Sequence, residues 1–281
     1  MTKKYAMVID INKCSGCYNC QLACKDEHCE HDYPGYAAPQ PMMGQFWMKV
    51  TERERGKYPK VKVAYTPVPC MQCKDASCLK AAQDGAIHRR PDGIVIIDPV
   101  KAKGQKQIVS ACPYRVIYWN EALQLPQKCT FCAHLLDDGW KEPRCVQACP
   151  TGALKVHRVD EQAMSHFKET ESLEILKPEL NTQPNVYYRN LFRYTTCFIG
   201  GSIAFNNGDV VDCAEEAEVV LLKDGERMAT MGTDNFGDFK FDALEENSGG
   251  YCLEIMFQDY DKKTMEIDVQ TSLNVGTILF F

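Results

Sequence analysis

The sequence lacks any apolar run close to the about 18 residues that a membrane-spanning helix needs, so we expect no span. Residues 1–10 contain no long apolar region, no small-residue cleavage site and no twin arginine, which are the marks of export signals. Basic residues are not in excess either: the formal net charge of -6 argues against a nucleic-acid partner. These absences favour a cytoplasmic protein that would be exported only by co-transport with a partner.

The sequence also lacks the motifs of a catalytic apparatus. It has no glycine-rich phosphate loop and no Ser or Cys nucleophile motif, so we expect no catalytic residue in this chain. What it has in excess is cysteine, with 16 in 281 residues. In a reducing compartment thiols stay free, and closely spaced cysteines there indicate metal rather than disulfides.

Twelve of the cysteines fall into runs with metal-ligand spacing. In the ferredoxin run C-x2-C-x2-C-x3-C, three cysteines wrap around three corners of a cuboidal cluster, and the fourth ligates the other cluster of a pair. One run here is regular, one carries an insertion, and one lacks its last member and is followed by an isolated cysteine. They are Cys14, Cys17, Cys20 and Cys24; Cys129, Cys132, Cys145 and Cys149; and Cys70, Cys73 and Cys78, with Cys112 after them.

An ancestral pattern of four such runs would place ligands at four positions that are not cysteine in this chain. These positions are Ala82, Ala102, Gln105 and Ile108. Under the crossed-ligand rule, all four serve the same cluster. Random loss would not be expected to remove one complete ligand set and leave the others whole. The sequence therefore predicts that one cluster has been lost and that three remain.

The prediction is three [4Fe–4S] clusters with four cysteines each. Cluster 1 takes Cys14, Cys17, Cys20 and Cys149; cluster 2 takes Cys24, Cys129, Cys132 and Cys145; and cluster 3 takes Cys70, Cys73, Cys78 and Cys112. We call these sets of positions site 1, site 2 and site 3. Structural zinc, which also uses paired C-x2-C, is the alternative, but the crossed fourth ligand has no rationale for zinc.

Residues beside the runs have two interpretations. Basic side chains next to ligands would raise cluster potentials through their charge, or they would form an ordinary solvated face. They are Lys13, Lys25, Lys128 and Arg144. The four cysteines outside the sites are expected to behave as small buried hydrophobes. They are Cys29, Cys197, Cys213 and Cys252.

A change in composition predicts two domains, because cysteine becomes rare after residue 149. Residues 1–195 are expected to form a double ferredoxin-like module and a linker, with a hairpin over 87–98 and a helix that begins after Asp160. Alternating strands and turns over residues 196–281 predict a small all-β domain, an immunoglobulin- or transthyretin-like sandwich or barrel. The predicted fold class is α+β.

The cysteine runs resemble those of the iron–sulfur subunits of the molybdopterin, or dimethyl sulfoxide reductase, family. Segments outside the runs make the resemblance more specific, since Asp32–Tyr36, Ala111–Asn120 and Asn235–Asp242 are similar to small subunits of the transhydroxylase and resorcinol hydroxylase type. The resemblance implies electron transfer within a heterodimer or a higher assembly. Its large subunit would carry a molybdenum or tungsten bis-pterin cofactor and act on polyhydroxylated aromatics, by transhydroxylation, hydroxylation or dehydroxylation.

Two other functions remain open from the sequence. The chain would serve another oxidoreductase of the same family, one that reduces sulfur compounds or N- and S-oxides. Alternatively, it would be a stand-alone ferredoxin-like carrier with a β domain for recognition. In each case the chain itself is expected to be non-catalytic, and the β domain is expected to dock a partner or to cap the iron–sulfur module.

Overall fold

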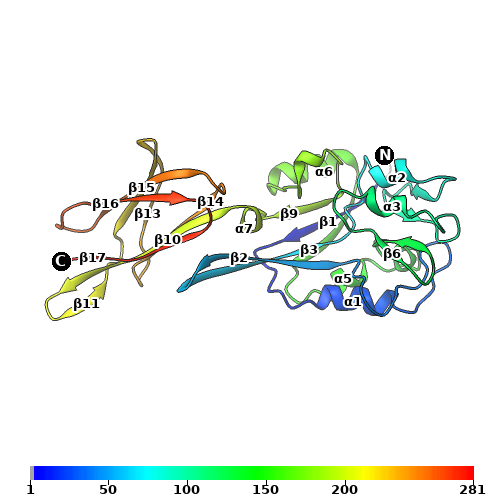
Figure 1. Cartoon of the computed structure of the whole chain (residues 1–281), viewed down its shortest axis with the longest axis horizontal. Helices are drawn as coiled ribbons and strands as arrows, with labels where there is room; N and C mark the ends of the chain where they lie inside the picture. The colour runs from blue at the N-terminus through cyan, green and yellow to red at the C-terminus, as the bar shows by residue number, and fades with distance from the viewer. Residues whose placement is uncertain (1–2) are drawn as a thin grey trace. The chain divides into compact units, whose positions relative to one another are not determined.

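The computed structural model describes residues 3–281 and divides into two compact units. Unit 1 comprises the chain up to Glu52 together with Tyr65–Leu191, and unit 2 comprises Arg53–Ala64 and Phe192–Phe281. Figure 1 shows the strands of unit 2 mainly in yellow to red. Within residues 3–281, no helix has both the length and the apolar character that crossing a membrane requires. The expectation about an export signal involves residues 1–2, which lie outside the described residues.

A three-stranded sheet forms the centre of unit 1. Strand β1 (Lys4–Asp10) lies between β8 (Leu154–Val159), which is antiparallel to it, and β9 (Val186–Arg189), which is parallel. The last five residues of β1 are all buried, as expected for a central strand with both faces covered. The first and last parts of the unit's sequence therefore meet in one sheet.

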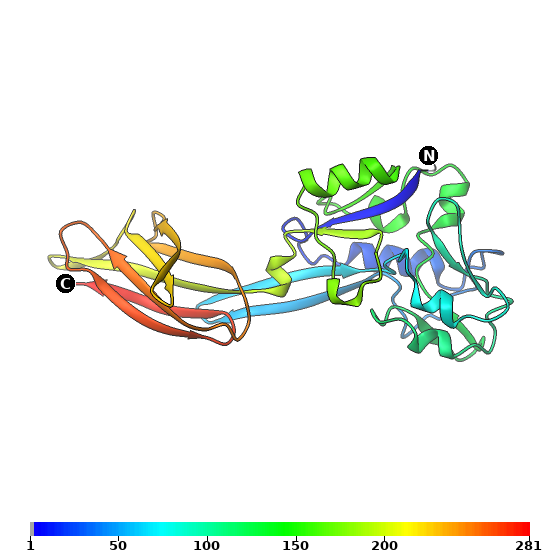
Figure 2. The same cartoon turned by 90° about the horizontal axis from the view of Figure 1, so that it is seen from above.

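Helix α6 (Glu161–Thr170) packs on this sheet, as Figures 1 and 2 show in green beside the blue β1. Its buried Met164 joins a hydrophobic cluster with Val8 and Tyr187. The Asp160 carboxylate accepts a hydrogen bond of 2.8 Å from the backbone N–H of Ala163, which satisfies one of the free donors of the first turn. The predicted start of this helix is confirmed.

The other elements of unit 1 are short and lie in loops around the sheet. They are α1 (Asn19–His28), α2 (Ser77–Ala81), α3 (Gln107–Ser110), α4 (Ala133–Asp137), α5 (Arg144–Gln147) and the 3-10 helix η1 (Pro178–Leu180), with the strand pairs β4 (Ile87–Arg89) and β5 (Val95–Ile97), and β6 (Tyr118–Asn120) and β7 (Leu125–Gln127). The hairpin predicted over 87–98 is the β4–β5 pair. The linker after α6 contains the turn of η1, flanked by left-handed backbone at Lys177 and Asn181.

The C-terminal part of unit 2, residues 192–281, contains eight strands. They are β10 (Cys197–Asn207), β11 (Val210–Cys213), β12 (Glu218–Lys223), β13 (Glu226–Gly232), β14 (Asp238–Leu244), β15 (Gly249–Met256), β16 (Lys263–Val269) and β17 (Leu273–Phe280), preceded by the short helix α7 (Phe192–Thr195). One sheet joins β11, β14 and β17 to β10, and the other has the order β13-β12-β15-β16. Both sheets contribute to one hydrophobic core, in which Ile203 meets Leu221 and Leu253.

The connecting end of a hairpin from the first quarter of the chain is also part of unit 2. Strands β2 (Lys49–Lys57) and β3 (Lys60–Val68) pair with each other, and their connecting end, residues 53–64, counts with the β domain. The buried Arg55 donates to Asp242 Oδ1 at 3.0 Å and to the Thr196 carbonyl at 3.2 Å. No local pattern in the sequence indicated this pairing between segments about 190 residues apart.

Arg55 and Arg53 offer a matched test of how the hairpin is held. We expect Arg55→Met to lower the free energy of unfolding of unit 2 by about 3 kcal/mol, because the partly buried Asp242 carboxylate loses the buried cation that faces it. Arg53→Met removes a more exposed pair with Glu246 and is expected to cost less than about 1 kcal/mol. Hydrogen exchange of the β14 amides measures both changes. Equal losses in the two variants would contradict the role of the buried pair.

Candidate metal centres

The four thiols of site 1 come together in unit 1 from opposite parts of its sequence. Three lie between the end of β1 and the first turn of α1, and the fourth follows α5. Burial raises the pKa of Cys20 to about 12, and the charges of Cys14 and Cys149 add to the rise. Burial also raises the pKa of Cys14, and Cys149 and Cys17 again contribute. Cys17 and Cys149 are therefore close enough to oppose ionisation of both Cys14 and Cys20.

Site 2 is the most enclosed of the three, because all four of its cysteines are buried. Burial is the main cause that holds the pKa of Cys24 well above its usual value, and the charges of Cys129 and Cys132 add to it. The pKa of Cys145 is raised in the same way, by burial first and then by Cys132, Cys24 and Cys129. The sequence prediction assigned these four thiols to one cluster, and the structure brings them together.

The thiols of site 3 line one cavity, whose walls include the apolar side chains of Val95, Val116 and Ile117. The four are Cys70, Cys73, Cys78 and Cys112. Burial raises the pKa of Cys73 to about 12, with further increases from its three neighbours in the site. Cys70 follows β3 and Cys73 precedes α2. Cys78 lies within α2, and Cys112 follows α3. Short elements are therefore enough to bring the four thiols together.

These thiols fit a cluster better than a single ion. Within residues 3–281, no three His, Cys, Asp or Glu side chains converge closely enough to hold one metal ion. A cuboidal cluster presents a separate iron corner to each thiolate and so accepts a wider arrangement. Burial raises the pKa of Cys20, Cys24 and Cys73, one thiol in each site. At Cys149 burial is outweighed by backbone and Thr151 hydrogen bonds, which lower the pKa. A strongly cationic group among the buried thiols, such as a bound metal, would offset the rise.

The charge of a thiol in one site raises pKa values in a neighbouring site, and these effects indicate the order of the three sites along unit 1. Burial raises the pKa of both Cys24 and Cys145 in site 2, and the charge of Cys20 in site 1 adds to both rises. Burial raises the pKa of Cys129 in site 2 to about 11, and Cys70 of site 3 adds to it with its charge, while the backbone N–H of Cys70 donates to the Cys129 sulfur. Site 2 therefore lies between site 1 and site 3.

The four positions of the missing ligand set form a plug of ordinary protein core. Ala102 and Ile108 are completely buried in a hydrophobic cluster that Ala82 also joins. Gln105 instead bonds the backbone: its amide accepts from Gln83 N–H at 2.9 Å and donates to the Gln83 and Lys101 carbonyls. Cys78 and Cys112 of site 3 pack against the same cluster. Apolar side chains thus fill the space beside site 3 that a fourth ligand set would have surrounded.

Side chains beside the ligands differ in ways that the sequence did not reveal. Lys128 is buried, whereas Lys13 is exposed and Arg144 lies 3.7 Å from a carboxylate oxygen of Glu27. Sequence reasoning gave histidine no role at the sites, yet the buried His28 has its Nε2 atom 3.9 Å from the Cys132 sulfur. Burial lowers the pKa of His28 to about 3, so the ring is neutral and can donate only one N–H.

The cysteines outside the sites follow the prediction only in part. Cys197 is completely buried in the core of unit 2, as expected. Cys29 and Cys252 are half-buried, and Cys213 is exposed, which corrects the expectation that it would be a buried hydrophobe. The reason is local, because all four residues of β11, which Cys213 ends, are exposed.

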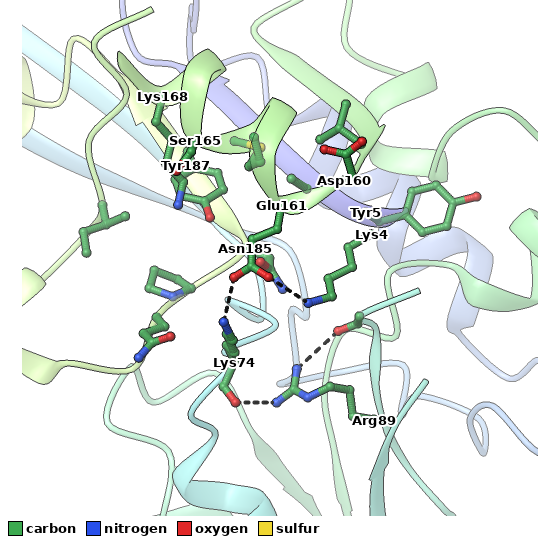
Figure 3. Close-up of a pocket in the computed structure, with 17 residues that line it drawn as sticks. Lys4, Tyr5, Lys74, Arg89, Asp160, Glu161, Ser165, Lys168, Asn185 and Tyr187 are labelled. Atoms are coloured by element: carbon green, nitrogen blue, oxygen red, sulfur yellow. Dashed lines mark hydrogen bonds and ion pairs between the residues drawn. The ribbon is translucent and has the colours of Figure 1, made fainter. Parts of the chain in front are cut away.

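A cavity of about 310 Å³ lies close to site 3, between α6 and the loop that follows Cys73 (Figure 3). Glu161 lies in it and pairs with Lys74 at 2.8 Å and with Lys4 at 4.0 Å. Arg89 donates to the Cys73 carbonyl at 2.6 Å and to the Lys74 carbonyl at 2.9 Å. The charged groups of this cavity are therefore engaged within the chain, and Arg89 fixes the loop that carries a ligand of site 3.

A family model described as a 4Fe–4S dicluster domain matches residues 61–159. The pyrogallol hydroxytransferase small subunit of Pelobacter acidigallici is 46% identical and aligns with 98% of this chain and 99% of its own. A tetrathionate reductase subunit of Salmonella typhimurium is 31% identical over 67% of this chain and 73% of its own. A polypeptide of the anaerobic dimethyl sulfoxide reductase of Escherichia coli is 30% identical over 66% of this chain and 93% of its own.

Ile108 and Cys112 test the contrast between the plug and site 3, because they lie four residues apart. We expect Ile108→Ala to lower the stability of unit 1 by about 2–5 kcal/mol, since it leaves a cavity in a filled core, without loss of iron from the folded protein. Cys112→Ala is expected to remove about four iron atoms per chain. Thermal unfolding measures the loss of stability in both variants, and iron analysis measures the loss of the cluster. Loss of about four irons from Ile108→Ala as well would contradict the contrast and mean that site 3 depends on the packing of the plug.

Proposed function

This chain is a member of the iron–sulfur electron-transfer subunits of the molybdopterin, or dimethyl sulfoxide reductase, family, and from this we propose that it carries electrons along three [4Fe–4S] clusters to or from a large catalytic subunit. The observation that carries the proposal is the arrangement of twelve thiols in three groups of four, in the order site 1, site 2, site 3. It supports the ligand assignment made from the sequence.

When bound, each cluster supplies a group that accepts and releases one electron. The chain's own residues hold the clusters through thiolates and adjust them through hydrogen bonds to sulfur, burial and nearby charge. The Thr151 hydroxyl lies 3.7 Å from the Cys149 sulfur, and the backbone N–H of Phe131 donates to Cys129 at 3.3 Å. Donors of this kind stabilise the reduced cluster, which carries one more negative charge.

Electrons would enter and leave at the two ends of this series. Site 2 is buried, so it is suited to relay electrons and not to meet a partner. Cys17 of site 1 is exposed, and three of the four cysteines of site 3 are only half-buried. We assign contact with the large subunit to one of these ends and contact with an external redox agent to the other.

The partner would carry a molybdenum or tungsten bis-pterin cofactor and act on polyhydroxylated aromatics. Similarity to the pyrogallol hydroxytransferase small subunit supports this substrate class, because that match includes residues 196–281, whereas the two other relatives align with about two thirds of the chain. If the partner's reaction moves a hydroxyl group without net oxidation, the clusters would serve to activate its metal or to keep it in the right oxidation state.

We assign the β domain a docking or capping role, with the domain boundary near residues 195–196 and an immunoglobulin- or transthyretin-like sandwich as its class. Two four-stranded sheets with a common core support the sandwich. The buried pair of Arg55 and Asp242 ties the hairpin of residues 53–64 to this domain. Any partner held by unit 2 is thereby linked through β2 and β3 to the chain that enters site 3.

The cluster count is tested by chemical analysis of anaerobically purified protein. We expect about twelve iron atoms and about twelve acid-labile sulfides per chain, with the brown colour of [4Fe–4S] clusters. About sixteen irons would mean that the missing ligand set is replaced by other residues. A colourless protein that contains zinc would contradict electron transfer and leave a structural scaffold.

The partner is tested by purifying the tagged chain anaerobically from its native cells, with an untagged extract as the control. We expect a large subunit to co-purify in equal amount, together with molybdenum or tungsten and a pterin. The purified complex should convert polyhydroxylated aromatics and leave sulfur oxides and N-oxides unchanged. Activity on the oxides alone would assign the chain to another branch of the family, and purification without any large subunit would favour the stand-alone carrier.

A further inference from the structure

Lys128 is a buried lysine without a carboxylate partner in the described chain. It lies between β7 and Cys129, and the residue is 2% exposed. Its Nζ atom donates to the Cys129 carbonyl at 3.1 Å and to the Val95 carbonyl, and both acceptors are neutral. No ion pair joins it to an Asp or Glu among residues 3–281. A charge in this position is costly unless something negative lies near it.

The negative groups near Lys128 belong to two different sites. Burial raises the pKa of Cys78 in site 3 to about 11, and the charge of Lys128 opposes the rise. Burial also raises the pKa of Cys129 in site 2 to about 11, and Lys128 again opposes it. Val95, whose carbonyl accepts from Nζ, lines the cavity of site 3. One acceptor of Nζ is thus the backbone of a site 2 ligand and the other lines the cavity of site 3, so the ammonium group lies between the two sites.

The other basic residues beside ligands do not share this position. Lys13 is exposed, so water screens its charge. Arg144 has Glu27 nearby as a counter-charge. Lys25 is only partly buried, and its Nζ atom donates to the Pro41 and Gln45 carbonyls. A buried cation with no counter-charge other than the thiolates is found among these four only at Lys128.

We propose that Lys128 is a shared electrostatic residue that raises the reduction potentials of clusters 2 and 3 together and leaves cluster 1 unchanged. The inference rests on the proposed function, because it needs the clusters in place. Each reduction adds one electron and one negative charge to a cluster, with no proton or ligand exchanged. A cation in a low-dielectric surrounding stabilises that added charge. Because both clusters face the same cation, an electron that moves from one to the other keeps its favourable partner.

The test is a redox titration of the anaerobically purified holoprotein, followed by electron paramagnetic resonance, for the unsubstituted chain and for Lys128→Met. Three one-electron steps are expected in the unsubstituted chain. In the variant, two of them should shift to lower potential and the third should stay in place. Lys128→Arg retains the charge and should keep all three steps near their original potentials. Lys13→Met, the exposed control, should shift none.

Iron and sulfide content is measured on every variant to separate lost charge from lost clusters. Lys128→Gln retains a donor for the two carbonyls and removes the charge, so we expect it to shift the same two steps. If Lys128→Met loses iron, Lys128→Gln tests the role of the charge in its place. A variant with full iron in which no step moves, only one moves, or all three move together would overturn the role of Lys128. Fewer than three steps in the unsubstituted chain would instead contradict the cluster count of the proposed function.

Discussion

Unit 1 depends on one constraint: most of the thiols that it gathers in groups of four resist ionisation because they are wholly or partly buried, and a strongly cationic group among them would remove the conflict. The raised pKa values of Cys20, Cys73 and Cys145 express that conflict for each site. The rest of the unit is built from small pieces, since four of its strands have only three residues each. In the proposed assignment, metal binding would therefore contribute folding free energy directly, because site 1 and site 2 join the beginning of the unit to segments more than 100 residues later.

Residue types and their local spacing in the sequence predict part of the fold and the candidate ligands. Asp160 marked the start of α6, and cysteine spacing predicts the groups of four. What the sequence could not reveal were pairings between distant segments and the burial of particular side chains. The hairpin of residues 53–64 reads as an ordinary charged strand pair, and only the fold brings Arg55 to Asp242. Lys128 is likewise one of several basic residues beside ligands, and nothing in its sequence neighbours indicates that it is fully buried.

The missing ligand set explains where the series of clusters would end. A fourth cluster beside site 3 would have extended the series, but Ala102 and Ile108 fill that space, and Gln105 bonds the backbone around it. The replacement is complete, because three positions became apolar and the fourth found backbone partners. A remaining thiol or an unsatisfied polar group there would have been costly in such a core. Site 3 is thus bordered by site 2 on one side and by apolar protein on another.

Burial also decides which charged residues can influence electron transfer in the proposed series. At site 1 the exposed Cys17 allows water and salt to screen nearby charges, so a lysine there has little effect. At site 2 all four cysteines are buried, and both the neutral His28 and the cationic Lys128 lie within the same low-dielectric region. Electrostatic interactions are stronger in such a region than at the surface. The middle of the series is therefore where the protein has most control over potential, and its ends are where it exchanges electrons with other molecules.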